Sequence, residues 1–152
     1  MDTINTLKQL VEDYIVFSID LRKKHSTLRS LFGQRAEEVY HPGHETFDTS
    51  VENWVRDFAA AQPAPEEVET AVELLLFCAE DHKDEAPYWY LTAIQRHSIP
   101  LIPLLDESRK AALLDRYLAL YPPRLQIPVQ TQVHQALNPQ ASRRKFRLFG
   151  KK

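Results

Sequence analysis

Glycine is scarce in this sequence of 152 residues, where it occurs only at positions 33, 43 and 150. Phosphate-binding loops such as GxxxxGK(S/T) and GxGxxG need closely spaced glycines, because their backbone must approach the phosphate without side chains in the way. No such loop is present, and neither is the GxSxG turn that exposes a catalytic serine. The sequence therefore argues against a nucleotide-binding fold and gives little support to hydrolytic catalysis.

Cysteine and long apolar runs are scarce as well. Cys78 is the only cysteine and lies in the most apolar stretch, so we expect a small core side chain with no disulfide and no stable thiolate. No uncharged apolar run approaches the ~20 residues of a membrane span. The first ten residues, MDTINTLKQL, have no apolar centre like that of a signal peptide. We expect a soluble cytoplasmic protein without a transmembrane segment.

Apolar residues recur every three to four positions along most of the chain, which is the helical period. No segment alternates with the period of two that a strand requires for long enough to count. We predict a single all-α domain over residues 1–138, an irregular helical bundle of six or seven mostly antiparallel helices. The alternative is a short HEAT-like stack of αα-hairpins, in which 44–79 and 87–121 would be the two pairs.

The most apolar stretch, 66–105, is interpreted as two buried helices joined by a charged loop. Pro65 suits the first position of a helix and Asp106 suits an N-cap. The first helix is predicted over Thr3 to Phe32, or as two helices that break near residues 24–27. The others are expected at 44–61, 66–79, 87–98, 106–121 and 128–137.

The apolar faces of these predicted helices give a predicted core. Its members are Tyr14, Phe17, Trp54, Phe58, Leu75, Phe77, Trp89, Leu91, Ile94, Leu114 and Leu118. In helix 106–121 the buried stripe is predicted to be Ala111, Leu114, Tyr117, Leu118 and Tyr121. In helix 128–137, Val129, Val133, Ala136 and Leu137 are expected to face inward, and Gln130, Gln132 and Gln135 outward.

Residues 139–152 are predicted to form a flexible basic tail. Residues 1–115 hold all 21 acids and 11 of the 19 Lys and Arg, whereas 116–152 hold the other eight bases and no acid. Phe146, Leu148 and Phe149 are interleaved with the bases, which a purely solvated tail does not need. Such a segment suits anionic lipid, nucleic acid or an acidic protein surface, including this protein's own body. The simpler alternative is a solvated tail that only aids solubility. The candidate partner-binding residues are Arg143, Arg144, Lys145, Phe146, Arg147, Phe149, Lys151 and Lys152.

The six histidines raise the question of a metal site. Glu38 and His41 have the E-x-x-H spacing that di-iron bundle proteins use twice, and His44 lies close by. One weak pair does not supply the three or four ligands of a metal centre, and Pro42 and Gly43 interrupt a common helix face. We therefore favour a surface turn at these residues, with Glu38, His41 and His44 kept as the alternative metal ligands. No cofactor is predicted.

Arg96 and His97 end a helix that carries Tyr88, Trp89 and Tyr90. Aromatic rings with a nearby cation are typical of small-molecule pockets. The simpler interpretation is that basic residues in a last turn complement the negative end of the helix dipole, while the rings fill the core.

The sequence favours a non-enzymatic interaction or adapter protein, although an enzyme is not excluded. Its helical body would bind a protein partner, and the basic-aromatic tail would contact an anionic membrane surface, nucleic acid or another acidic surface. The alternative function is a small-molecule or metal-binding helical bundle, with or without enzymatic activity, built on Glu38, His41 and His44 or on Arg96 and His97.

Overall fold

The computed structural model describes residues 2–32, 42–81 and 92–138. Within these ranges it contains five α-helices, four short 3₁₀ segments and no strand, which confirms the all-α prediction. The elements are α1 (Asp2–Phe32), α2 (Pro42–Ala60), α3 (Pro65–Phe77), η2 (Cys78–Asp81), η3 (Ile94–Ser98), η4 (Ile102–Leu104), α5 (Glu107–Leu120), η5 (Pro123–Leu125) and α6 (Pro128–Leu137).

Several helix starts follow directly from the sequence. Pro65 and Pro128 occupy first-turn positions, where the missing N–H leaves no hydrogen bond unmade. Asp106 caps α5, since its Oδ1 accepts a hydrogen bond from the backbone N–H of Arg109 at 2.8 Å. α1 is one continuous helix, so the predicted break near residues 24–27 does not occur. α2 begins at Pro42, two residues earlier than expected, because that proline also suits a first turn.

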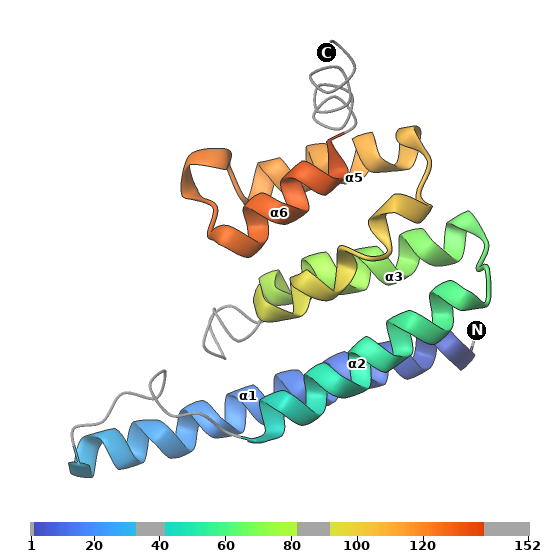
Figure 1. Cartoon of the computed structure of the whole chain (residues 1–152). Helices are drawn as coiled ribbons and strands as arrows, with labels where there is room; N and C mark the ends of the chain where they lie inside the picture. The colour runs from blue at the N-terminus through green and yellow to red at the C-terminus, as the bar shows by residue number, and fades with distance from the viewer. Residues whose placement is uncertain (1, 33–41, 82–91, 139–152) are drawn as a thin grey trace, which may run out of the picture.

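One layer of the fold consists of α1, α3 and α5, which run in the same direction (Figure 1). Arg109 of α5 reaches Glu66 of α3, and Arg116 reaches Glu73, so each pair spans 43 positions. A constant separation along the chain is what two parallel helices produce. The early residues of α1 and α3 line one hollow together and their later residues line another, as parallel helices also would.

The second layer consists of α2, η3 and α6, each of which runs against its partner in the first layer (Figure 1). Trp54 Nε1 donates to the carbonyl oxygen of Thr3 at 2.9 Å, while Tyr14 stacks on Phe47 with ring centroids 3.9 Å apart. Later positions in α1 therefore meet earlier positions in α2, as in an antiparallel pair. Three successive pairs, α1 with α2, α3 with η3, and α5 with α6, stack in chain order within the bundle.

This stacking has the form of the αα-hairpin alternative, but the pairs are not those expected. The sequence suggested 44–79 and 87–121, whereas α2 pairs with α1 and α5 pairs with α6. The reason is the length of α1, which spans 31 residues. Because α1 is so much longer than the other helices, the sequence did not indicate that it pairs with α2. The predicted pairs are therefore shifted by one helix.

Most of the predicted core is buried. Tyr14, Trp54, Phe58, Leu75, Phe77 and Ile94 are in it, Phe17, Leu114 and Leu118 are half-buried, and Trp89 and Leu91 lie outside the described residues. In α5 the buried face is centred on Leu113 and Tyr117, and Ala111 is exposed, contrary to the prediction. The sequence of α5 is apolar on two adjacent faces, which is why the predicted stripe is rotated by about one residue. No helix in the described ranges is long and apolar enough to span a membrane.

Gln130 corrects a second prediction, because it is 2% exposed rather than outward-facing. Its Oε1 accepts a hydrogen bond from the backbone N–H of Ile127 at 3.1 Å, which caps the start of α6. A glutamine three residues after the N-cap supplies this half of a capping box, and Ile127 has no side-chain oxygen to supply the other half. The position of Gln130 in the sequence therefore indicated this hydrogen bond, which turns its side chain toward the start of α6 and away from solvent.

Candidate functional site

The first candidate site is a groove of about 660 Å³ on the second layer, which we call the α2–η3 groove. It crosses all three elements of that layer, and its lining residues are Glu52, Val55, Arg56, Ala59, Arg96, His97, Ile99, Pro100 and Gln132. Its size lies within the roughly 300–1,000 Å³ of small-molecule sites. The floor is largely apolar, and charged groups lie at its rim.

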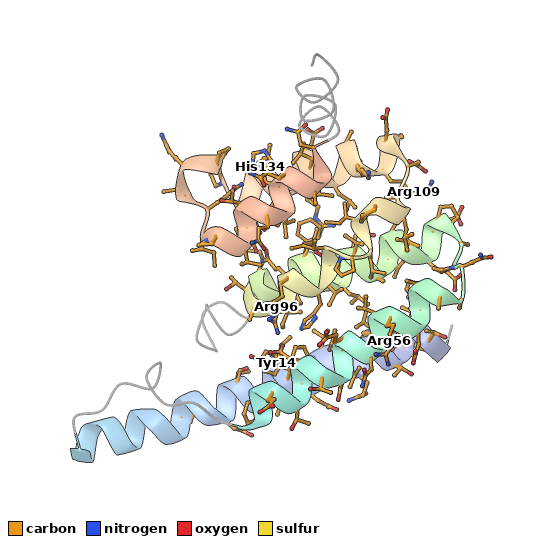
Figure 2. All side chains as sticks on the ribbon, in the orientation of Figure 1. Tyr14, Arg56, Arg96, Arg109 and His134 are labelled. Atoms are coloured by element: carbon orange, nitrogen blue, oxygen red, sulfur yellow. The ribbon has the colours of Figure 1, made fainter. Side chains whose placement is uncertain are left out.

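Beside this groove, Asp48 of α2 makes two bonds to η3. His97 Nε2 lies 3.0 Å from Asp48 Oδ1, and an Arg96 guanidinium nitrogen lies 2.6 Å from Asp48 Oδ2. In Figure 2, Arg96 extends from the η3 segment toward α2. One carboxylate therefore holds two consecutive basic side chains, and it fixes η3 against α2.

His97 is buried, and this burial lowers its pKa below the ordinary value. The hydrogen bond that His97 makes to Asp48 raises the pKa without cancelling the effect of burial, while the nearby Arg96 lowers the pKa further. A carboxylate only accepts hydrogen bonds, so Nε2 carries the proton and donates it to Asp48. The ring also packs edge-on to Phe47, with centroids 6.0 Å apart.

The chemistry of the α2–η3 groove suits binding better than nucleophilic catalysis. In a catalytic triad the aspartate binds Nδ1 of the histidine and leaves Nε2 to act as the base. In this groove Asp48 occupies Nε2. No serine, threonine or cysteine is among the residues that line this groove where the structure describes it. Arg96 and His97 both line this groove, whereas the sequence favoured a role of these bases at a helix end. Their partner is Asp48, whereas Tyr88, Trp89 and Tyr90 lie outside the described residues.

A second groove lies on the first layer, and we call it the α1–α3–α5 groove. Its volume is about 670 Å³, and its lining residues are Lys8, Val11, Glu12, Ile15, Thr70, Glu73, Leu74, Phe77, Cys78, Glu80, Arg116, Ala119 and Leu120. Aliphatic and aromatic side chains form its floor. Arg116 spans one wall, since its guanidinium carbon lies 3.9 Å from the ring centroid of Phe77 and its nitrogen 3.1 Å from Glu73 Oε2.

Cys78 lines this groove and is half-buried, so it packs against the core, as the sequence predicted, but is not enclosed by it. α3 ends at Phe77, and the chain continues as the 3₁₀ segment η2, which has three residues per turn. Leu74, one helical turn earlier, is half-buried too, so this side of α3 lies at the edge of the core.

An exposed apolar surface adjoins the second groove. Leu120, Leu125 and Ile127 are 39%, 68% and 38% exposed, and all three lie on the turn that joins α5 to α6. We call this surface the α5–α6 turn. Leu120 belongs both to the turn and to the α1–α3–α5 groove, which makes the two surfaces continuous.

The other predicted site residues lie outside the described part of the chain. These are the whole tail, residues 139–152, and Glu38 and His41 of the alternative metal site. His44 falls in the first turn of α2, but its side chain is outside the description. Across the side chains that the structure does describe, no group of three or more His, Cys, Asp and Glu could hold a metal ion.

Sequence reasoning missed Asp48 and the α5–α6 turn. Asp48 is 49 positions from His97, and a contact of this range has no local signal. The turn had a signal that was not used, since Leu125 and Ile127 stand among prolines in a segment that cannot continue a helix. No protein-family model, no curated protein and no solved structure matches this chain.

Proposed function

We propose that this protein is a non-enzymatic interaction protein whose helical body binds a protein partner and whose basic-aromatic tail contacts an anionic surface. The proposal rests on the α5–α6 turn. Three of the five large apolar side chains that are exposed in the described ranges lie between residues 120 and 127. Contiguous exposed apolar surface is uncommon on proteins that act alone, and it typically marks an interaction site.

The continuity of this turn with the α1–α3–α5 groove supports the same proposal. Leu120 connects an exposed apolar ridge to a groove with an apolar floor and a charged rim. Interfaces often combine an apolar centre with a polar rim in this way. A partner that covers the turn would find a recess beside it for a further side chain.

The test uses Leu125→Glu, which places a charge at the most exposed of these side chains. Proteins that bind the full chain would be captured from native lysate and identified by mass spectrometry. The matched control is Leu104→Glu, at a side chain that is 45% exposed on η4, away from the turn. We expect a specific partner to be lost from Leu125→Glu and retained by Leu104→Glu. Equal retention by both variants would contradict a role for the turn.

The tail forms the second half of the proposal. Arg143, Arg144, Lys145, Arg147, Lys151 and Lys152 would bind phosphate or carboxylate groups, and Phe146 and Phe149 would add apolar contact. We include a cytoplasmic location in this proposal, because a chain with a single cysteine suits a reducing compartment.

A second candidate is small-molecule binding in the α2–η3 groove. It is favoured by one observation, the convergence of Arg56, Arg96 and His97 on a recess with an apolar floor. A thermal-shift screen of small carboxylates and phosphates, compared between the unmodified protein and Arg56→Ala, tests this candidate. A ligand that raises Tm only when Arg56 is present would support it, and a screen without such a ligand would count against it.

A further inference from the structure

We propose that the α1–α3–α5 groove is the binding site for the chain's own C-terminal segment, residues 139–152, which docks there intramolecularly. This inference rests on the groove and on the sequence of the segment. It does not depend on the α5–α6 turn, and its test needs no partner, so its failure can be told apart from failure of the function proposed above. A docked segment would have to leave the groove before it contacts another anionic surface.

The groove and the segment are complementary in charge. α3 and η2, residues 65–81, carry six acids and no base, and Glu73 and Glu80 of this stretch line the groove. Glu12 adds a third carboxylate from α1. The segment 139–152 carries six bases and no acid. Opposite charges of this kind bring two surfaces together and disfavour other binding modes.

The two are also complementary in their apolar parts. Val11, Ile15 and Phe77 are buried at the floor of the groove, and Leu74 and Leu120 are partly accessible at its sides. The segment supplies Phe146, Leu148 and Phe149 among its bases. Aromatic rings are the largest single source of apolar contact area, and such anchors need a recess to enter.

The length of the segment permits this docking. It follows α6, whose end lies near the start of α5 because the two helices are antiparallel neighbours (Figure 1). The groove lies near the end of α5, and the rise along that helix from Arg109 to Leu120 is about 16 Å. The nine positions from Leu137 to Phe146 can extend over ~30 Å. Phe146 can therefore reach the groove without any change in the described helices.

The charges of the two grooves favour one of them as the docking site for residues 139–152. The α2–η3 groove carries Arg56 and Arg96 against one lining acid, Glu52, and this balance disfavours a cationic segment, although Arg96 is also held by Asp48. The α1–α3–α5 groove has three carboxylates against two bases, Lys8 and Arg116, and Arg116 is already held by Glu73 and Phe77. A cationic segment with aromatic anchors therefore fits the first layer of the fold and not the second.

Cys78 makes the test direct, because it lines the groove and is the only cysteine in the chain. The rate at which an uncharged maleimide modifies Cys78 would be measured in the full chain and in the full chain with Phe146→Ala and Phe149→Ala. We expect the double variant to react about tenfold faster, the factor that corresponds to about 1.4 kcal/mol of docking free energy. Equal rates in the two proteins would overturn the proposal.

Two matched substitutions locate the docking site. Glu12→Lys changes the rim of the α1–α3–α5 groove, and Glu52→Lys makes the same change at an exposed position in the α2–η3 groove. We expect faster modification of Cys78 with Glu12→Lys, no effect of Glu52→Lys, and no further effect of Glu12→Lys when Phe146 and Phe149 are already alanine. If protection of Cys78 increases with protein concentration, the occupant is a second copy and the intramolecular proposal is wrong.

Discussion

Asp48 and His97 lie 49 positions apart in the sequence, yet Asp48 Oδ1 is 3.0 Å from His97 Nε2. The bond joins the middle of α2 to η3, and the second carboxylate oxygen of Asp48 also holds Arg96. Packing of Phe47 against the imidazole, and of Tyr14 against Phe47, continues the contact into the core. This relationship couples α2 and η3 to a histidine whose pKa is lowered by burial.

The first prediction concerns acid pH. Burial lowers the pKa of His97, so below its ordinary value of about 6.5 the unfolded chain binds more protons than the folded one. The free energy of unfolding should therefore be highest above pH 6.5 and fall as the pH decreases from there toward the folded pKa. Urea unfolding at a series of pH values measures this dependence of the free energy of unfolding on pH. His97→Gln should flatten this dependence, whereas His134→Gln, which leaves His97 in place, should preserve it.

Asp48→Asn should lower the pKa of His97 further, because the carboxylate supplies both the hydrogen bond and the charge that favour the imidazolium. NMR titration of the imidazole measures this directly. We expect the loss of stability to extend to lower pH in this variant. A pKa that rises on the substitution would show that Asp48 does not stabilise the charged ring.

A third prediction tests the buried bond between Tyr117 and Gln95. The hydroxyl of Tyr117 donates to Gln95 Oε1 at 2.6 Å, and both side chains are fully buried. Tyr117→Phe would leave that oxygen without its donor in an apolar environment. We expect a decrease of about 1–3 kcal/mol in the free energy of unfolding. The effect should be smaller when Gln95 is already leucine, and an additive pair of losses would show that the bond contributes little.

The core of α3 provides a fourth prediction. Leu75 is 0% exposed, so Leu75→Ala should leave a cavity and decrease the free energy of unfolding by about 2–5 kcal/mol. Leu104→Ala removes the same atoms from a side chain that is 45% exposed, and it should cost less than about 1 kcal/mol. Denaturant titration of both variants gives the comparison. Similar losses would mean that Leu75 does not occupy the centre of the core.

The fifth prediction concerns the metal alternative at Glu38, His41 and His44. Protein purified without chelator should contain no stoichiometric metal by elemental analysis, and EDTA should not change its Tm. The reason is that one E-x-x-H pair supplies too few ligands for a stable centre. A stoichiometric metal content that His41→Ala abolishes would instead support the alternative function.

Much of the helical framework could be predicted from the sequence because its signals are local. Apolar spacing located the helices, and Asp106 and Pro65 marked two starts correctly. The buried face of α5 could not be chosen this way, since Leu113 and Leu114 are equally apolar and only the position of α6 and α3 decides between them. Pairing of the helices failed for a similar reason, because the partner of α2 depends on how the long α1 folds back.

The candidate site could be predicted only in part. Arg96 and His97 were considered as pocket residues, although the interpretation as bases at a helix end was preferred, and both line the α2–η3 groove. Their shared partner Asp48 lies on α2, far away in the sequence, and this contact arises from tertiary packing that the sequence does not show.

The most direct test of the interaction function compares three full-length proteins in capture from native lysate, at low and moderate salt. They are the unmodified chain, Leu125→Glu, and a chain with the six tail bases replaced by glutamine. We predict a partner that Leu125→Glu fails to hold and that the tail variant holds more weakly, with the tail's contribution lost at moderate salt. Capture of the same partners by all three proteins, or of none by the unmodified chain, would contradict the proposed function.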